Sequence, residues 1–262
     1  MAFLKGLGVS ILLTILSMGI ANAANVVVFY NATYVDTGAT GSAEATNEIA
    51  TLTAQGHTVT TFTGITATAI TAATAGQDVL VIPELENGDL NAALNAAART
   101  AIHDFVTGGG QLIINGQGTS HEVDLLNAIF GYSLVDSGSM SSGSLAGPTT
   151  LGANNGTELI TTASVPPGAT ILYTANAGAD TAVFVNNEGA GQVIFLAWDW
   201  FNAVPVGAAD NGWLAVLDAA VKGTLAPKSP SAVPTLSQWA LMLMVLLLGV
   251  AGYNLSRSKK GF

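Results

Sequence analysis

The uncharged stretch at residues 236–255 constrains this chain more than any other feature of its sequence. As an α-helix with a rise of 1.5 Å per residue it would be roughly 30 Å long, about the thickness of the hydrocarbon core of a bilayer. Trp239 and Tyr253 lie near its two ends, where aromatic rings prefer the headgroup level. We therefore predict a transmembrane helix over about residues 236–255. The alternative is a buried helix of a soluble domain, which would normally carry a polar stripe.

Positive charge follows this stretch. Arg257, Lys259 and Lys260 form the one dense cluster of cations in the sequence. Basic residues that flank a membrane helix stay on the cytoplasmic side. We therefore expect a cytoplasmic tail that stops transfer, with the rest of the chain on the other side of the membrane.

A short motif precedes the apolar stretch, and it consists of Val233, Pro234, Thr235, Leu236, Ser237, Gln238 and Trp239. The proline keeps the preceding residue extended and cannot continue a helix from upstream. We expect the motif to be an accessible extended segment at the outer membrane boundary, where a protease can read it.

Motif, apolar helix and basic tail together resemble the IPTL-CTERM protein-sorting domain over residues 232–262. This domain is a relative of the PEP-CTERM signals that exosortase-type membrane transpeptidases handle in Gram-negative bacteria. The family pattern is Ile-Pro-Thr-Leu-Ser-Glu-Trp, from which the chain departs at Val233 and Gln238. The resemblance implies that an exosortase-type enzyme recognises and cuts the signal. The chain would first be anchored in the inner membrane with its main domain on the periplasmic side, and would then pass to the cell surface or the medium.

The beginning of the sequence has the pattern of a secretory signal peptide. Lys5 precedes an apolar run over residues 7–20, and Ala21 and Ala23 supply the small side chains that signal peptidase requires. We therefore predict a signal peptide at residues 1–23 and signal peptidase as a partner.

These two ends divide the sequence into parts. We expect an α/β ectodomain at residues 24–225, a Pro/Ser linker at residues 226–232 and the sorting signal at residues 233–262. The ectodomain has about 200 residues, which is enough for one domain with a substantial core.

Charge and cysteine content exclude two classes of function. Between residues 24 and 226, Arg99 and Lys222 are the only cations and all 17 acidic residues of the chain are present, which gives this part a formal charge of −15. Such a domain repels nucleic acid and anionic membrane surfaces, so we expect no nucleic-acid partner. The chain has no cysteine, so neither disulfides nor thiol chemistry are available.

The ectodomain sequence favours an α/β fold. Short apolar runs at residues 25–30, 78–82 and 111–114 are typical of parallel strands covered on both faces, and helical patterns separate them. We expect Ser42 and Asn91 to cap helices that run to about residues 54 and 106. This alternation predicts a mostly parallel sheet with helices on both faces.

The second half should be richer in β-structure. Candidate strands lie at residues 170–174, 181–187 and 192–197, and a hairpin-type turn at residues 188–191 joins the last two.

This order of elements resembles the class I glutamine-amidotransferase-like (flavodoxin-like) group. The landmarks are the apolar first strand, a third strand that ends at Pro83, a helix that ends at Gly110, and a glycine turn followed by a helix. The group's nucleophile would follow the strand at residues 112–114 and its histidine would follow the last strand. The chain has no cysteine at the first position and residues 198–201, Trp-Asp-Trp-Phe, at the second.

A serine nucleophile is a weaker alternative at the same turn. Ser120 is followed by Glu122 where a strained nucleophile elbow needs glycine, and the neighbours Ser120, His121 and Glu122 point about 100° apart on a helix. We expect Ser120 to cap a helix and predict no catalytic residue.

Acidic residues mark a candidate ligand site. Glu84, Glu86 and Asp89 follow the third strand at its carboxyl end, where open α/β sheets bind ligands. Carboxylate oxygens suit Ca²⁺, although solvated loop acids are the commoner outcome of such a pattern. His103 and His121 lack the spacing of a zinc site.

Trp198, Asp199 and Trp200 leave the last strand at the same edge. Two indoles and a carboxylate would stack on and hydrogen-bond a carbohydrate. The alternative is that the rings close the end of the core, because indoles are usually buried.

The sequence thus favours an exported, surface-sorted protein whose α/β ectodomain is a non-catalytic binding or structural module. A divergent hydrolase of the amidotransferase-like group, using the acids at 84, 86 or 199, is one alternative. An adhesin or extracellular matrix component is the other.

Overall fold

The computed structural model describes residues 23–39, 41–116, 119–141, 144–148 and 157–227. The predicted signal peptide, except for its last residue, and the predicted transmembrane helix, sorting motif and basic tail lie outside these ranges. Within them, the structure has no helix that is long and apolar enough to cross a membrane.

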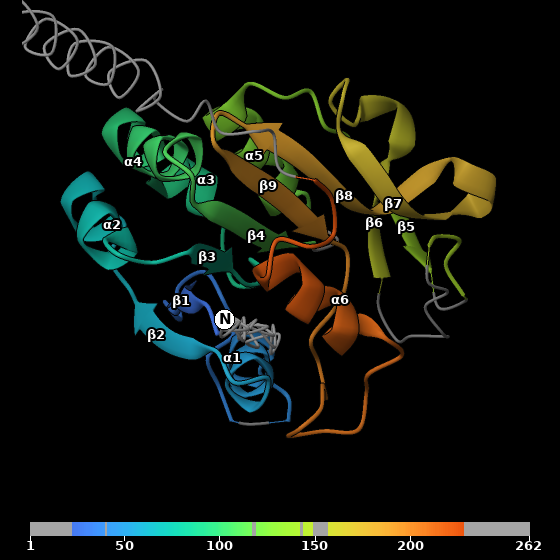
Figure 1. Ribbon diagram of the computed structural model, residues 1–262, viewed down its shortest axis with the longest axis horizontal. Helices are drawn as coiled ribbons and strands as arrows, with labels where there is room; N and C mark the ends of the chain where they lie inside the picture. The colour runs from blue at the N-terminus through green and yellow to red at the C-terminus, as the bar shows by residue number, and fades with distance from the viewer. Residues whose placement is uncertain (1–22, 40, 117–118, 142–143, 149–156, 228–262) are drawn as a thin grey trace, which may run out of the picture.

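One mixed sheet of nine strands forms the centre of the described part (Figure 1). Its first half is parallel, and its spatial order is β2 (Thr58–Phe62), β1 (Asn25–Phe29), β3 (Val79–Ile82), β4 (Gln111–Asn115) and β9 (Gly191–Leu196). Counted along the chain, this is the order 2-1-3-4-5 of doubly wound folds. Connections between these strands therefore run in opposite directions from β1 and β3.

The second half of the sheet is antiparallel. It continues from β9 through β8 (Asp180–Glu188) and β6 (Thr157–Thr161) to β5 (Asp136–Ser141), and β7 (Thr170–Ala175) also pairs with β8. Two short 3₁₀ turns, at Thr162–Ser164 and Asn176–Gly178, flank β7. Glu188 pairs with Gly191 at the end of the β8–β9 ladder, which confirms the predicted hairpin.

Helices lie on both faces of the sheet (Figure 1). One layer contains α1 (Glu44–Ala54) and α6 (Trp213–Val221), which are joined where the Gln55 side chain donates to the Leu214 carbonyl at 2.7 Å. The other layer contains α2 (Ala67–Thr74), α3 (Leu90–Ala93), α4 (Ala96–Thr107) and α5 (His121–Phe130), and α4 packs on both α2 and α5. The predicted mixed α/β architecture is confirmed.

The core follows from this layering. Strands β3 and β4 are buried along their whole length, because helices cover both faces. Trp198 and Trp200 extend the core beyond β9, and the Trp198 ring stacks on Trp213 of α6 with centroids 5.7 Å apart. Burial of aromatic surface of this size is a main source of stability in a chain that has no disulfides.

Two predicted helix caps are wrong. Ala43 occupies the N-cap position of α1, and the Ser42 hydroxyl instead donates to the Ala39 carbonyl. The long helix expected after Asn91 is divided into α3 and α4, because Asp89 and Asn95 each accept a hydrogen bond from a first-turn N–H. Two capping side chains six positions apart thus start two helices where the apolar periodicity indicates one.

Candidate functional site: an acidic cluster at the sheet edge

The strand order changes direction between β1 and β3, so their carboxyl ends form a topological switch point. The chain leaves β1 toward β2 on one side and leaves β3 toward β4 on the other. Doubly wound folds bind their ligands at such a switch point, because the diverging connections leave a crevice there. Asp36 and Glu44 follow β1, and Glu84 and Glu86 follow β3.

Three of these carboxyl groups meet. Asp36, Glu44 and Glu86 each place one oxygen within 4.8 Å of the others. Glu44, the first residue of α1, is buried, Asp36 is half-buried and Glu86 is exposed. The group therefore reaches from the protein interior to solvent.

Glu84 and Asp199 extend the group into the interior. Glu84 is only 6 % exposed, and its pKa is raised by burial first, then by the charge of Glu158 and then by those of Asp199 and Glu44. Asp199 follows β9, and the charge of Glu86 acts on it in turn. We call Asp36, Glu44, Glu84, Glu86 and Asp199 the acidic cluster.

Burial and mutual repulsion disfavour ionisation of this cluster. Burial, followed by the charges of Glu86, Asp199 and Asp36, raises the pKa of Glu44 to about 8, and a hydrogen bond from its own main-chain N–H opposes the shift. Burial is also the main cause that raises the pKa of Glu84 well above its ordinary value and the main cause that raises the pKa of Asp199. At neutral pH the cluster therefore needs bound protons, a compensating positive charge, or both.

The cations of the described range are engaged elsewhere. The Arg99 guanidinium donates to the Asn91 carbonyl at 2.6 Å, and the Lys222 ammonium pairs with Asp218 at 2.7 Å. Neither cation of the described residues thus supplies the compensation that clustered carboxylates usually have.

Two further buried acids on this edge have hydrogen-bond donors. The amide of Asn115 donates to both oxygens of Glu48 at 3.0 Å and accepts from the Trp200 indole at 2.9 Å. Glu122 accepts from the Leu85 main-chain N–H at 2.5 Å. Burial raises the pKa of Glu48 and of Glu122 to about 8. These two acids tie α1 to β4 and α5 to the loop after β3.

The predicted ligand residues do not all lie at one site in the structure. Glu84, Glu86 and Asp199 are brought into one cluster, whereas the Asp89 carboxylate accepts from the Ala92 N–H as the cap of α3. The indoles of Trp198 and Trp200 are fully buried, with ring centroids 4.6 Å apart, so their faces meet protein rather than solvent.

Asp36 and Glu44 are the members that sequence reasoning missed. Their position after the first apolar strand is a usable signal only together with the knowledge that β1 lies beside β3.

The helix start after β4 has no serine–histidine contact. Ser120 has a left-handed backbone with φ of 65°, and its hydroxyl lies 3.4 Å from the Asp124 carboxylate. It occupies the N-cap position of α5 without a capping hydrogen bond from its side chain. His121 Nδ1 lies 3.0 Å from the Leu85 carbonyl and 3.1 Å from the Thr119 hydroxyl.

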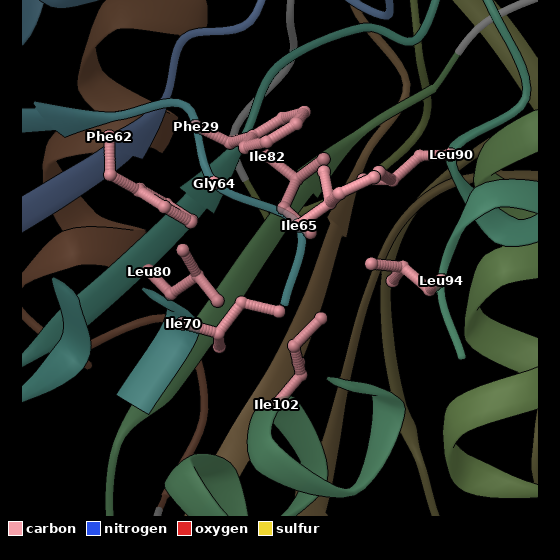
Figure 2. A pocket seen from close by; sticks show the side chains of 10 residues that line it. All are labelled: Phe29, Phe62, Gly64, Ile65, Ile70, Leu80, Ile82, Leu90, Leu94 and Ile102. Atoms are coloured by element: carbon pink, nitrogen blue, oxygen red, sulfur yellow. The ribbon is translucent and has the colours of Figure 1, made fainter. Parts of the chain in front are cut away.

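A small concavity lies between the sheet and helices α2, α3 and α4. Figure 2 shows aliphatic and aromatic side chains pointing at one another around it, and the space between them is only about 10 Å³. That is the volume of about one water-sized probe, and an apolar lining offers water no partner. The lining residues are Phe29, Phe62, Gly64, Ile65, Ile70, Leu80, Ile82, Leu90, Leu94 and Ile102. This concavity is a packing gap of the core.

Comparison with known proteins identifies the sorting segment. Residues 231–257 match the family described as IPTL-CTERM motif, which confirms that part of the sequence prediction. The match includes the whole stretch from Val233 to Trp239 and reaches Arg257. No curated protein sequence matches the chain.

Solved structures are similar at low identity. A cytoplasmic protein, STM3548, from Salmonella typhimurium has 12 % identity and a TM-score of 0.48, over 75 % of this chain and 97 % of that one. A putative GMP synthase component from Thermoplasma acidophilum has 10 % identity and a TM-score of 0.47, over 76 % of this chain and 95 % of that one. A β-galactosidase from Rahnella sp. R3 has 19 % identity and a TM-score of 0.44, over 78 % of this chain and 32 % of that one.

The chain thus spans about a third of the length of that β-galactosidase. At this level of similarity, none of the three indicates what the chain binds or catalyses. What the comparisons establish is that the chain carries an IPTL-CTERM motif at residues 231–257.

Proposed function

We propose that this protein is exported and sorted to the cell surface, where its α/β domain acts as a binding or structural module rather than an enzyme. The observation that carries the proposal is the IPTL-CTERM match at residues 231–257. It coincides with the uncharged stretch at residues 236–255 and the basic residues that follow it. Motif, membrane helix and basic tail are the three parts that a sorting enzyme of the exosortase type would recognise.

The order of events follows from these parts. Signal peptidase would cut after Ala23, and the helix at residues 236–255 would hold the chain in the inner membrane with the α/β domain on the periplasmic side. Cutting within the sorting signal would then release the domain. The Pro/Ser linker at residues 226–232 would keep the motif away from the folded domain, because proline-rich segments are extended and stiff.

Two positions support a non-catalytic role. The order 2-1-3-4-5 of the parallel strands agrees with the amidotransferase-like resemblance, in which a nucleophile follows the strand corresponding to β4. The turn at residues 115–120 has no cysteine, and the side chain of its first residue, Asn115, is hydrogen-bonded to Glu48 and Trp200. After β9, where the group has its histidine, the chain has the buried Trp198 and Trp200.

The intact mass of the protein recovered from the cell exterior tests the sorting proposal. We expect a species that lacks residues 1–23 and at least the helix at residues 236–255. The double variant Pro234→Ala/Trp239→Ala should accumulate untrimmed in the inner membrane, whereas Pro227→Ala, outside the motif, should be processed normally. Full-length chain in the cytosol with both apolar ends intact would contradict the proposal.

A divergent hydrolase is the second candidate, and the raised carboxyl pKa values of Glu44 and Glu84 favour it. A carboxyl group that stays protonated near neutral pH can serve as a general acid. A screen of ester, amide and glycoside substrates with and without EDTA checks this candidate. Turnover that is lost in Glu84→Gln would support the hydrolase, whereas binding of carbohydrate or self-association without turnover would support an adhesin or matrix component.

A further inference from the structure

We propose that the acidic cluster is a calcium-binding site in which Asp36, Glu44 and Glu86 supply carboxylate ligands, with Glu84 and Asp199 behind them. This inference goes beyond the sorting function. It concerns the α/β domain only, so it stands or fails independently of export.

The spacing of the three carboxylates fits calcium. Their oxygens lie within 4.8 Å of one another. Because Ca²⁺ binds oxygen at about 2.3–2.6 Å, ligands on opposite sides of the ion lie up to roughly 5 Å apart. Mg²⁺ binds at about 2.0–2.1 Å and demands a near-ideal octahedron, whereas Ca²⁺ accepts a flexible arrangement of carboxylate oxygens. The cluster contains neither histidine nor cysteine, which zinc prefers.

Buried oxygens without donors point independently to a bound cation. One oxygen of Glu44 and one of Glu84 have no hydrogen-bond partner, although these residues are only 7 % and 6 % exposed. Glu44 is itself one of the three residues whose carboxylate oxygens meet, so its buried carboxyl group faces the proposed site. A buried polar atom without a partner costs free energy, and a cation held by Asp36, Glu44 and Glu86 would remove that cost for Glu44.

The protein frame around the cluster is already assembled. The Asn87 main-chain N–H donates to the Tyr34 carbonyl at 3.0 Å, which joins the loop after β3 to the loop after β1. The Asn202 N–H donates to the Gly41 carbonyl at 2.9 Å, which joins the segment after β9 to the β1–α1 connection. The ligands therefore come from loops that are held together without the ion, as a specific site requires.

Because Gly88 has no side chain, the loop after β3 can lie close to the loop after β1. A Cβ atom there would lie 2.7 Å from the Thr33 carbonyl oxygen, nearer than side-chain and backbone atoms come. A larger residue at this position would push apart the two loops that carry Asp36 and Glu86.

Calcium and magnesium titrations of the full-length protein, purified in detergent and freed of metal with EDTA, test the proposal. We expect calorimetry to show binding of one Ca²⁺ per chain, at millimolar or lower concentration as in extracellular calcium modules. Thermal unfolding in about 10 mM calcium should show a Tm higher by about 3–10 °C than in EDTA. Magnesium should give a smaller shift.

Variants decide whether the cluster is responsible. At pH 8 without calcium, Glu44→Gln/Glu86→Gln should unfold at a higher temperature than the wild type, because repulsion among the carboxylates of the cluster is reduced. The same variant should lose the calcium shift. A higher Tm in EDTA together with a lost calcium shift indicates a lost ligand. A damaged fold would instead lower the Tm in EDTA as well. If that happens, the single variant Asp36→Asn takes its place and should weaken calcium binding at least tenfold.

Asp89→Asn is the matched control. It removes a carboxylate from the same loop but keeps a good helix cap, so the calcium shift should persist. The proposal is overturned if the wild-type Tm does not respond to calcium, if Glu44→Gln/Glu86→Gln responds as the wild type does, or if Asp89→Asn loses the response equally. None of these outcomes affects the mass of the exported species, which tests sorting.

Discussion

Two sets of buried acidic residues lie at the same edge of the sheet. They differ in the hydrogen-bond donors that their carboxyl oxygens have. The Asn115 side-chain N–H groups donate to both oxygens of Glu48, and the Asn115 side-chain oxygen accepts from the Trp200 indole. In the acidic cluster, Glu44 and Glu84 are nearly as buried but each keeps an oxygen without a donor. Burial alone therefore does not mark a binding site. A missing donor beside neighbouring carboxylates points to a bound cation, because the cation removes the cost of the unpaired oxygen.

Removing the Asn115 side chain, which donates to Glu48, should have the largest effect on stability. Asn115→Ala would leave Glu48 and the Trp200 indole without partners, so we expect the free energy of unfolding to fall by about 3 kcal/mol or more. Urea unfolding of the full-length protein at pH 7 measures it. Glu48→Gln, which keeps a hydrogen-bonding amide beside Asn115, should cost less. A loss below about 1 kcal/mol for Asn115→Ala would mean that the two groups of acids do not differ as described.

Filling the space at Gly88 should have the second-largest effect, and it concerns the acidic cluster. Gly88→Ala places a methyl group against the Thr33 carbonyl and pushes apart the loops that carry Asp36 and Glu86. We expect a loss of about 2 kcal/mol in stability and a smaller calcium shift in Tm. Gly56→Ala serves as a comparison, because a Cβ there meets nothing within 4 Å and only its positive φ of 87° is strained. Equal calcium shifts in the two variants would contradict the role given to the loop contact.

The pH dependence of stability sharpens the comparison further. The pKa of Glu44 is raised from 4.5 to about 8, so the folded protein holds a proton there that the unfolded chain releases between these values. Stability from this group is complete below about pH 4.5 and is lost as the pH rises toward 8. In EDTA, Glu44→Gln should reduce the slope in this window by up to about 1.4 kcal/mol per pH unit.

The groups facing Glu44 bear on this slope. They are the carboxyls of Asp36, Glu86 and Asp199, with Glu84 close by. Denaturant titrations at several pH values measure the slope, and calcium should flatten it because the ion replaces the proton. An unchanged slope in Glu44→Gln would show that Glu44 does not carry the bound proton.

The smallest effect concerns the acid outside the cluster. Asp89→Ala removes the cap of α3, and we expect it to lower stability by about 1 kcal/mol without changing the calcium shift. Asp89→Asn should lie within a few tenths of a kcal/mol of the wild type. Thermal unfolding with and without calcium compares both variants. A calcium shift reduced in both would place Asp89 among the ligands.

The sequence predicts the architecture well where burial dominates. Strands β3 and β4 are continuous apolar runs because they are covered on both faces, and the hairpin at Glu188 has a clear turn signal. Strand β5 was missed, because Asp136–Ser141 is rich in serine and has no apolar alternation. The division between α3 and α4 was missed because local capping by Asp89 and Asn95 outweighs the helical periodicity.

The candidate site was predictable only in part. Glu84, Glu86 and Asp199 can be found because each follows a strand at its carboxyl end. Asp36 and Glu44 become their neighbours only through the pairing of β1 with β3, and strand order is a long-range property that a residue pattern does not contain. Asp89 looks equivalent to Glu86 in the sequence, but its short side chain satisfies a helix end instead.

The tryptophan stack beyond β9 gives the protein a built-in optical reporter. Of its four tryptophans, Trp198, Trp200 and Trp213 pack together, and the fourth, Trp239, belongs to the segment that sorting would remove. Asp199 lies between two of the packed indoles in sequence. We expect a change of charge or coordination at that carboxylate to alter the electric field on their rings, so that the fluorescence of a processed protein would report on the cluster without any added label.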